Sequence, residues 1–147
     1  MIRKPEREDA AGLAEICREA LGHTADPAVV ERQIARLNAD PAYVLLVAET
    51  SGEVAGFLQA QTYDLLYGGR GLNIIALAVA PVWQGRGMGA GLLAALEERA
   101  RQEGRDFIRL NSRVEREAAH RFYERQGFVC DKTQKRFIKR WENRPGL

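Results

Sequence analysis

The chain has 147 residues, of which 46% are hydrophobic and 29% are charged, and its formal net charge is +2. This length and composition are typical of one globular domain with a real core, so the sequence predicts a single domain over residues 1–147. Such a small net charge gives no support for binding to nucleic acid or to a membrane surface, and we expect neither partner.

Hydrophobic periodicity and turn residues predict regular structure along most of the chain. In the first half, the expected elements are a short strand at 1–4, helices at 8–21 and 27–37, hairpin strands at 43–49 and 54–62, and a central strand at 72–79. In the second half, they are a helix ending near 104, a strand at 107–110, a helix at 117–126, and strands at 128–130 and 136–141. This order predicts an α/β fold on a mixed central sheet. The continuous apolar run at 72–79 indicates a strand covered on both faces.

The segment after the central strand is the most informative part of the sequence. It contains Gln84-Gly85-Arg86-Gly87-Met88-Gly89-Ala90, directly before an amphipathic helix. Glycines allow sharp turns and the close approach of a ligand because they carry no Cβ atom. The unpaired N–H groups at the start of the helix, together with the positive end of its dipole, favour an anion. The loop therefore predicts a site for a phosphate or pyrophosphate.

One family with such a loop is the dinucleotide-binding fold. Gly85-x-Gly87-x-x-Ala90 fits the permissive form of its fingerprint. Residues 81–84 nevertheless separate the loop from its strand, and the next strand ends in Asn111-Ser112, where the fingerprint needs an acidic residue. The Walker pattern is also absent, because no Gly-Lys-Ser/Thr follows the glycines. A dinucleotide-binding enzyme is the third interpretation of the sequence.

A different pattern fits better. Gln84-x-x-Gly87-x-Gly89, preceded by the strand residues LAVAP at 77–81, resembles the Gln/Arg-x-x-Gly-x-Gly/Ala signature of the GNAT superfamily of acetyl-CoA-dependent N-acetyltransferases. The segment AAHRFYERQGF at 118–128 is similar to that family's Ala-x-x-x-Tyr-x-x-x-Gly-Phe motif. The two motifs have the order and separation found in the family. The resemblance implies a single-domain GNAT fold, with six to seven strands in one mixed sheet and about four flanking helices.

The resemblance also implies an activity and a set of site residues. The activity is transfer of the acetyl group of acetyl-CoA to a primary amine, by direct attack in a ternary complex. The segment around Arg116 resembles a branch that includes aminoalkylphosphonate and other small-amine acetyltransferases, which points to a small-molecule acceptor. The implied residues for binding coenzyme A are Leu77, Ala78, Val79, Gln84, Gly85, Arg86, Gly87, Met88, Gly89, Ala90, Asn111, Arg116, Ala119 and Tyr123.

Tyr123 is the catalytic residue that the resemblance implies. A phenol, whose ordinary pKa is about 10, can protonate the departing thiolate of coenzyme A and yet stay un-ionised at neutral pH. Ala119 lies one helical turn before Tyr123 and leaves room there for the pantetheine arm. The alternative is that Tyr123 is a packed aromatic residue beside Phe122.

The sequence departs from the common family pattern in two places. The central strand carries no carboxylate that could serve as general base, and Arg116 stands where many relatives have asparagine. His23, Asp64 and Glu49 are the candidate bases, with water or an already neutral amine as the alternative. The missing base also leaves open a second interpretation, a non-catalytic acyl-CoA-binding sensor or interaction module. The oligomeric state is open, with a homodimer as one option.

Cysteine content and the amino terminus bear on compartment and metals. Cys17 and Cys130 are too few for a disulfide framework, and no cluster of cysteine and histidine has the spacing of a metal site, so we expect no metal. The amino-terminal residues MIRKPERED lack the apolar core of a signal peptide, and no apolar run approaches the length of a membrane span. The expected location is the reducing cytoplasm.

Overall fold

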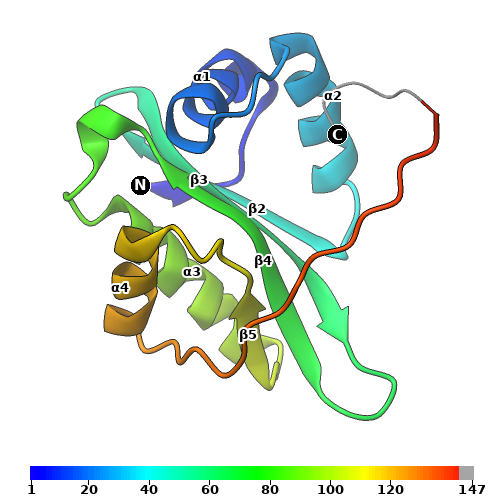
Figure 1. Ribbon diagram of the computed structural model, residues 1–147. Coiled ribbons are helices and arrows are strands. Elements are labelled where there is room, and N and C mark those ends of the chain that lie inside the picture. Colours follow the sequence, from blue (N-terminus) through cyan, green and yellow to red (C-terminus); the bar gives the residue numbers. More distant parts are fainter. Residues whose placement is uncertain (143–147) are drawn as a thin grey trace. The chain divides into compact units, whose positions relative to one another are not determined.

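The computed structural model describes residues 1–142 (Figure 1). The chain divides into two compact units. The first unit is Met1–Asn111, and the second begins at Ser112. Each unit is described by itself below. That residues 1–147 form a single domain stays a prediction.

The first unit is built on one five-stranded sheet. Its elements are β1 (Ile2–Arg3), the short 3₁₀ helix η1 (Arg7–Asp9), α1 (Ala10–Leu21), α2 (Pro27–Asn38), β2 (Tyr43–Thr50), β3 (Glu53–Asp64), β4 (Arg70–Val79), the 3₁₀ helix η2 (Pro81–Trp83), α3 (Met88–Gln102) and β5 (Phe107–Leu110). The strand order is β1-β2-β3-β4-β5; β4 and β5 run parallel and the other neighbours antiparallel. The mixed sheet of an α/β fold is therefore confirmed.

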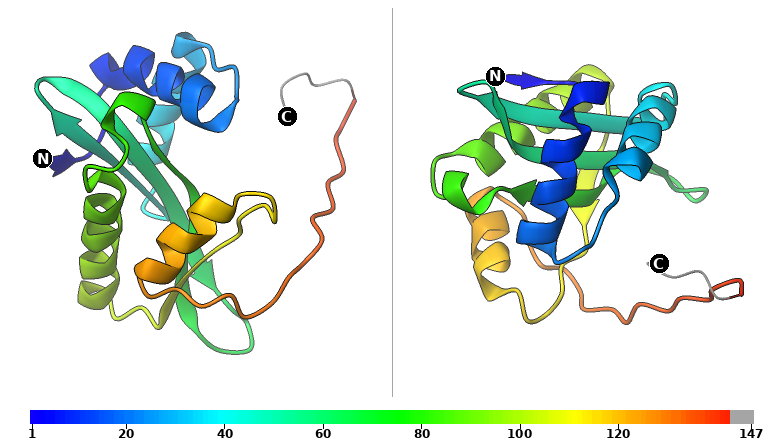
Figure 2. Two further views of the ribbon diagram at one scale, coloured as in Figure 1. Left: turned by 60° about the vertical axis from the view of Figure 1, so that its left-hand side comes forward. Right: turned by 90° about the horizontal axis from the view of Figure 1, so that it is seen from above.

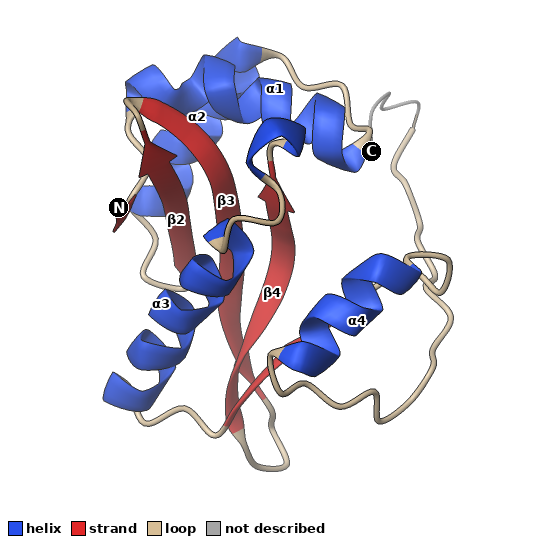
Figure 3. Ribbon diagram, turned by 90° about the vertical axis from the view of Figure 1, so that its left-hand side faces the viewer, coloured by secondary structure: helices blue, strands red, loops and turns tan. Residues whose placement is uncertain are grey.

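Helices cover both faces of this sheet. Helices α1 and α2 lie on one face and α3 lies on the other (Figure 3). On the α1–α2 face, Ala10, Leu13, Ile34 and Val47 form a buried cluster. On the opposite face, α3 buries a stripe at helical spacing, which consists of Leu92, Leu93, Leu96 and Ala100. The apolar periodicity of the sequence thus sets which side of each helix meets the sheet.

The second unit contains α4 (Glu117–Arg125), which brings the α-helices of the described residues to the expected four. Residues 128–142 continue from it without helix or strand (Figure 2). The prediction of six to seven strands is therefore wrong, because the strands expected at 128–130 and 136–141 are not formed. A strand needs a neighbour to take its backbone hydrogen bonds and a layer to cover its apolar side. Phe137 and Trp141 instead remain exposed.

No helix within residues 1–142 is long and apolar enough to cross a membrane.

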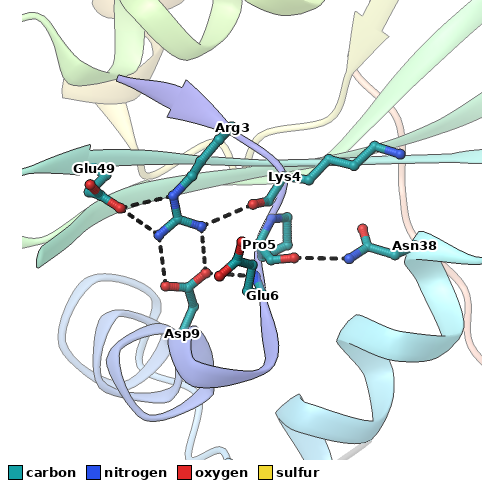
Figure 4. Close-up of polar contacts among 7 residues, drawn as sticks. All are labelled: Arg3, Lys4, Pro5, Glu6, Asp9, Asn38 and Glu49. Carbon is teal, nitrogen blue, oxygen red and sulfur yellow. Dashed lines mark hydrogen bonds and ion pairs between the residues drawn. The ribbon is translucent and has the colours of Figure 1, made fainter. Parts of the chain in front are cut away.

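An ion-pair network ties β1 to β2 and to the short helix η1 that precedes α1 (Figure 4). The guanidinium of Arg3 donates to both carboxylate oxygens of Asp9, at 2.7 and 3.0 Å, and from Nε to Glu49 at 2.9 Å. Asp9 also accepts from the backbone N–H of Glu6 at 2.7 Å. The hydrogen bond from Arg3 holds the pKa of Asp9 below its ordinary value, although burial acts in the opposite direction.

We expect Asp9→Asn to destabilise the first unit by about 2 kcal/mol, because the substitution removes a charge-assisted pair from a largely buried position. The folded pKa of Asp9 lies below its unfolded value, so this stabilisation is present above the unfolded pKa of about 3.9. It is lost as the pH falls through the folded pKa. Urea unfolding at neutral and at acidic pH measures both effects. The control is Glu98→Gln on the exposed face of α3, and an equal loss of stability in both variants would contradict the prediction.

Candidate functional site

Strand β4 loses its β5 neighbour halfway along its length. β5 pairs with Gly71–Ile74, whereas β3 pairs with β4 as far as Val79. The last residues of β4, 75–79, therefore have a strand on the β3 side and none on the β5 side within residues 1–142. We call this stretch the open edge of β4.

A β-bulge marks the point at which the open edge begins. Opposite Gln59 and Ala60 of β3 lie Ala76 and Ile74 of β4, so Ile75 is an extra residue without a partner on β3. A bulge of this kind bends its strand. The side chain of Ile75 is 45% exposed. The expectation that this strand is covered on both faces is therefore wrong at Ile75.

Backbone groups of Leu77 and Val79 point to the open side of β4. The N–H of Ala80 donates to Ala55 O at 2.7 Å, so Ala80 directs its backbone groups at β3. Successive residues of an antiparallel strand alternate in this respect, and Leu77 and Val79 therefore direct theirs away from β3. The side chain of Gln84 donates to Val79 O at 3.1 Å. The N–H of Val79 and both backbone groups of Leu77 have no hydrogen-bond partner in the described part of the chain.

The loop after β4 presents a run of unpaired N–H groups at the start of α3. Gly85 and Gly87 have φ angles of +76° and +83°, in the region that residues with a Cβ rarely adopt. Gly87 is the N-cap residue of α3, and no side chain accepts from the first N–H groups of this helix. The first helical hydrogen bond runs from the N–H of Gly91 to Gly87 O, at 2.9 Å. Between Gly85 and Ala90 the N–H groups have no acceptor within residues 1–142. Residues 84–87 are exposed.

Arg86 adds a positive charge to this loop. Its guanidinium lies 5.1 Å from the centre of the Trp83 ring, a cation–π contact. Within the described residues, Arg86 forms no ion pair with a carboxylate. The N-terminus of a helix and an unpaired arginine both favour an anion at this position.

The first unit therefore brings most of the sequence-predicted residues together. The open edge supplies Leu77, Ala78 and Val79, and the loop with the first turn of α3 supplies Gln84, Gly85, Arg86, Gly87, Met88, Gly89 and Ala90. Asn111 directly follows β5, and its side-chain oxygen accepts from Arg109 at 2.6 Å. Arg116, Ala119 and Tyr123 belong to the second unit.

Tyr123 lies on α4 of the second unit. Its ring packs edge-on against Phe122 and Phe128, with ring centres 5.4 and 5.8 Å away. Burial raises the pKa of Tyr123, while the charge of Arg116 acts to lower it. The hydroxyl group has no hydrogen-bond partner among residues 1–142. Tyr123 is thus both a packed aromatic residue and a phenol that keeps its proton at neutral pH.

The three candidate bases are dispersed over the first unit. Glu49 is bonded to Arg3 in the network of Figure 4. Asp64, at the end of β3, accepts from Arg105 at 3.0 Å. His23 is exposed beyond the end of α1, and β4 carries no carboxylate. The residues that the structure describes hold no group of three or more His, Cys, Asp or Glu side chains placed to bind a metal.

Sequence reasoning missed a polar row on the α1–α2 face of the sheet. Its members are Tyr43, Gln61, Asn73 and Arg109, which lie opposite one another on β2, β3, β4 and β5. The one local signal for this row is Asn73, the polar residue that interrupts the apolar run of the central strand.

Known proteins are similar to most of this chain. A family model described as the acetyltransferase (GNAT) family matches residues 10–128. The chain is 30% identical over 128 residues to the aminoalkylphosphonate N-acetyltransferase of Salmonella typhimurium, across 86% of this chain and 83% of that protein. It is 33% identical over 131 residues to the aminoglycoside N(6')-acetyltransferase type 1 of Stenotrophomonas maltophilia, across 86% of this chain and 84% of that protein.

A solved structure shows the same fold. The structure described as a transcriptional regulator from Bacillus halodurans matches with a TM-score of 0.85 at 24% identity. The match covers 95% of this chain and 99% of that one. At this level of identity the likeness concerns the fold alone.

Proposed function

Because the chain belongs to the GNAT family of acetyltransferases and is therefore an acyltransferase, we propose that it transfers the acetyl group of acetyl-CoA directly to a primary amine of a small molecule. The observation that carries this proposal is the open edge of β4, which leads into a loop of unpaired N–H groups at the start of α3. The names of the two relatives, which describe an aminoalkylphosphonate and an aminoglycoside acetyltransferase, support an amine acceptor.

The residues of the first unit fit both ends of coenzyme A. Its pantetheine arm carries amides that can pair with an open strand edge, and Leu77 and Val79 offer backbone groups for that pairing. Its pyrophosphate suits the N–H groups between Gly85 and Ala90, with Arg86 as an additional positive charge. Asn111, Arg116 and Ala119 are proposed to contact coenzyme A on the strength of the family motif.

The proposed chemistry needs one oxyanion donor and one acid. Coenzyme A supplies the acetyl group as a thioester. The C–N bond to the acceptor forms as the C–S bond breaks, and a backbone N–H of the open edge stabilises the carbonyl oxygen as it gains charge. Tyr123 donates its proton to the departing sulfur. The proton that the amine loses returns to Tyr123 through solvent.

We expect the rate to depend on the fraction of the acceptor amine that has lost its proton, because β4 holds no carboxylate to act as an internal base. The value of kcat/KM should rise with pH until the amine's own pKa is reached. This rising part of the pH profile should shift to lower pH when a less basic acceptor replaces a more basic one. Two acceptors whose amine pKa values differ by about 2 units make the comparison. If the rising part stays at one pH for both acceptors and disappears in Asp64→Asn or His23→Ala, that side chain is the base.

We expect Gly56→Ala to distort the open edge. An added Cβ at Gly56 of β3 would stand 2.8 Å from the backbone oxygen of Ala78 and 3.3 Å from Cγ2 of Val79. Because the backbone oxygen is held within the paired strand, the two strands must move apart, at a cost of about 1–3 kcal/mol in stability. Affinity for acetyl-CoA should fall with it. The control is Gly12→Ala on α1, where the nearest atom to the added Cβ is 3.8 Å away. Equal affinity in both variants would contradict the prediction.

Calorimetric titration with acetyl-CoA, and separately with NAD⁺, tests the proposed cofactor. We expect saturable binding of acetyl-CoA alone, and a melting temperature that rises with its concentration. No binding at millimolar acetyl-CoA removes the proposal. Binding of NAD⁺ in its place restores the dinucleotide interpretation.

A further inference from the structure

The polar row on the α1–α2 face lies beside an apolar core. The side chains of Val47 and Phe57 share this face of β2 and β3, and they pack in the core with α1 and α2. On the same face, Tyr43 lies four residues before Val47 on β2, and Tyr63 lies six residues after Phe57 on β3. Gln61 of β3 lies opposite Tyr43 and is partly buried. The sheet face therefore changes from apolar to polar along its strands, and all four side chains of the polar row are partly exposed.

Arg109 is the charged member of the row, and neutral groups hold it in place. Its Nη1 donates to Asn73 Oδ1 and its Nη2 donates to Asn111 Oδ1, both at 2.6 Å. Its guanidinium lies 4.8 Å from the centre of the Tyr63 ring, which packs edge-on against Phe107. The side chain is thus fixed by contacts from β3, from β4 and from Asn111 beyond the end of its own strand, which lowers the entropy cost of binding through it.

No carboxylate of residues 1–142 forms an ion pair with Arg109. The contrast within the first unit is direct, since Arg3 pairs with Asp9 and Arg105 pairs with Asp64. A guanidinium has five N–H donors, and the two amide oxygens use two of those on Arg109. A partly buried cation with free donors and no counter-ion favours an anion with planar or tetrahedral oxygens.

We propose that Arg109 binds an anionic oxyacid group, a carboxylate or a phosphonate, carried by the amine acceptor. The inference rests on the proposed function and names the substrate class for it. Asn73, which holds Arg109, lies two residues before Ile75, where the open edge begins, and this is roughly 7 Å along the strand. The amine of a short amino acid or aminoalkyl oxyacid bound at Arg109 is therefore within reach of the open edge. The same charge repels an acceptor with several ammonium groups.

Matched pairs of acceptors test this assignment. Glycine is compared with glycinamide, and aminoethylphosphonate with ethanolamine, as kcat/KM of the wild-type chain and of Arg109→Gln, each taken on the plateau above the acceptor's own amine pKa so that differences in basicity do not enter. We expect the wild type to prefer the anionic member of at least one pair, and Arg109→Gln to lose on the order of 100-fold on that member, as for one charge-assisted contact of about 3 kcal/mol. The neutral members should change little. The pair with the larger preference identifies the carboxylate or the phosphonate.

Two further variants separate binding from structure. Arg101→Gln removes an equal charge from the exposed end of α3, where Arg101 pairs with Glu98, and should leave both pairs unchanged. Arg109→Lys keeps the positive charge but loses the paired N–H donors of the guanidinium, so it should raise KM for the anionic acceptor with little change in kcat. This variant replaces Arg109→Gln in the test if Arg109→Gln does not fold. An equal loss on both members of a pair, or no anionic preference in the wild type, overturns the inference.

Titration of glycine and aminoethylphosphonate into the complex with coenzyme A keeps the two proposals distinct. If no amine is acetylated, the proposed function fails, and binding that Arg109→Gln abolishes still supports the anion site. If amines are acetylated but the anionic acceptors bind equally to both forms, the anion site fails alone.

Discussion

Gly87→Val is expected to lower the affinity for acetyl-CoA by on the order of 100-fold, which corresponds to about 3 kcal/mol. Gly87 has a φ of +83° and caps α3 at the centre of the run of unpaired N–H groups. A branched side chain disfavours that φ and places a Cβ where the backbone is proposed to meet the pyrophosphate. No atom of the described chain outside the adjacent residues lies within 4 Å of that Cβ, so the loss reports on the ligand rather than on an internal clash. Gly89→Val, in the first turn of α3, should act in the same direction.

The opposite end of α3 provides the control for this variant. Gly104 has a φ of +68°, and an added Cβ there also has no atom within 4 Å. Gly104→Val therefore carries a similar backbone strain and should keep the affinity for acetyl-CoA. Calorimetry gives the affinity of both variants, and thermal unfolding gives their stability. Equal losses of affinity would assign the effect to strain, and wild-type affinity in Gly87→Val would make the loop merely structural.

Tyr123→Phe is expected to lower kcat by about 10²–10⁴-fold, the usual contribution of a general acid, while acetyl-CoA affinity and the fold are retained. The substitution keeps the ring that packs against Phe122 and Phe128, and removes only the hydroxyl group. A general acid acts only while protonated, and burial raises the pKa of Tyr123. The alkaline fall of kcat should therefore lie above about pH 10, and it should be missing in Tyr123→Phe.

Steady-state kinetics with chemistry shown to be rate-limiting, together with calorimetry, resolves the outcomes. An unchanged kcat would refute the acid role. A loss of acetyl-CoA binding with an intact kcat at saturation would instead make Tyr123 a packing residue, as its aromatic neighbours also allow.

Elements whose signals are local were predictable from the sequence. Asp26-Pro27 indicates the start of α2, and Asp26 does accept from the N–H of Ala28 at 2.8 Å. Ser51 and Gly52 indicate the hairpin turn, and their φ angles of +51° and +76° are those of a tight β-turn. The glycines after the central strand indicate a sharp loop before a helix, and that loop forms where expected. In each case, a few adjacent residues determine the backbone.

Features that depend on pairing between distant segments were not predictable. An apolar run does not say which of its residues is left out of the ladder, so the bulge at Ile75 is invisible in the sequence. The members of the polar row, Tyr43, Gln61, Asn73 and Arg109, become neighbours only through the register of four strands. The alternation at 136–141 indicated a strand, yet alternation alone supplies no neighbouring strand to pair with.

The release of coenzyme A thiol at saturating acetyl-CoA, followed with and without each amine of an acceptor panel, tests the central claim most directly. Acetyl transfer predicts release that rises with amine concentration until it saturates, is largest for an amine that carries an oxyacid group, and yields one acetylated amine for each thiol. Release that is the same with every amine as with none, from a chain that binds acetyl-CoA, would contradict the claim and leave an acyl-CoA-binding module.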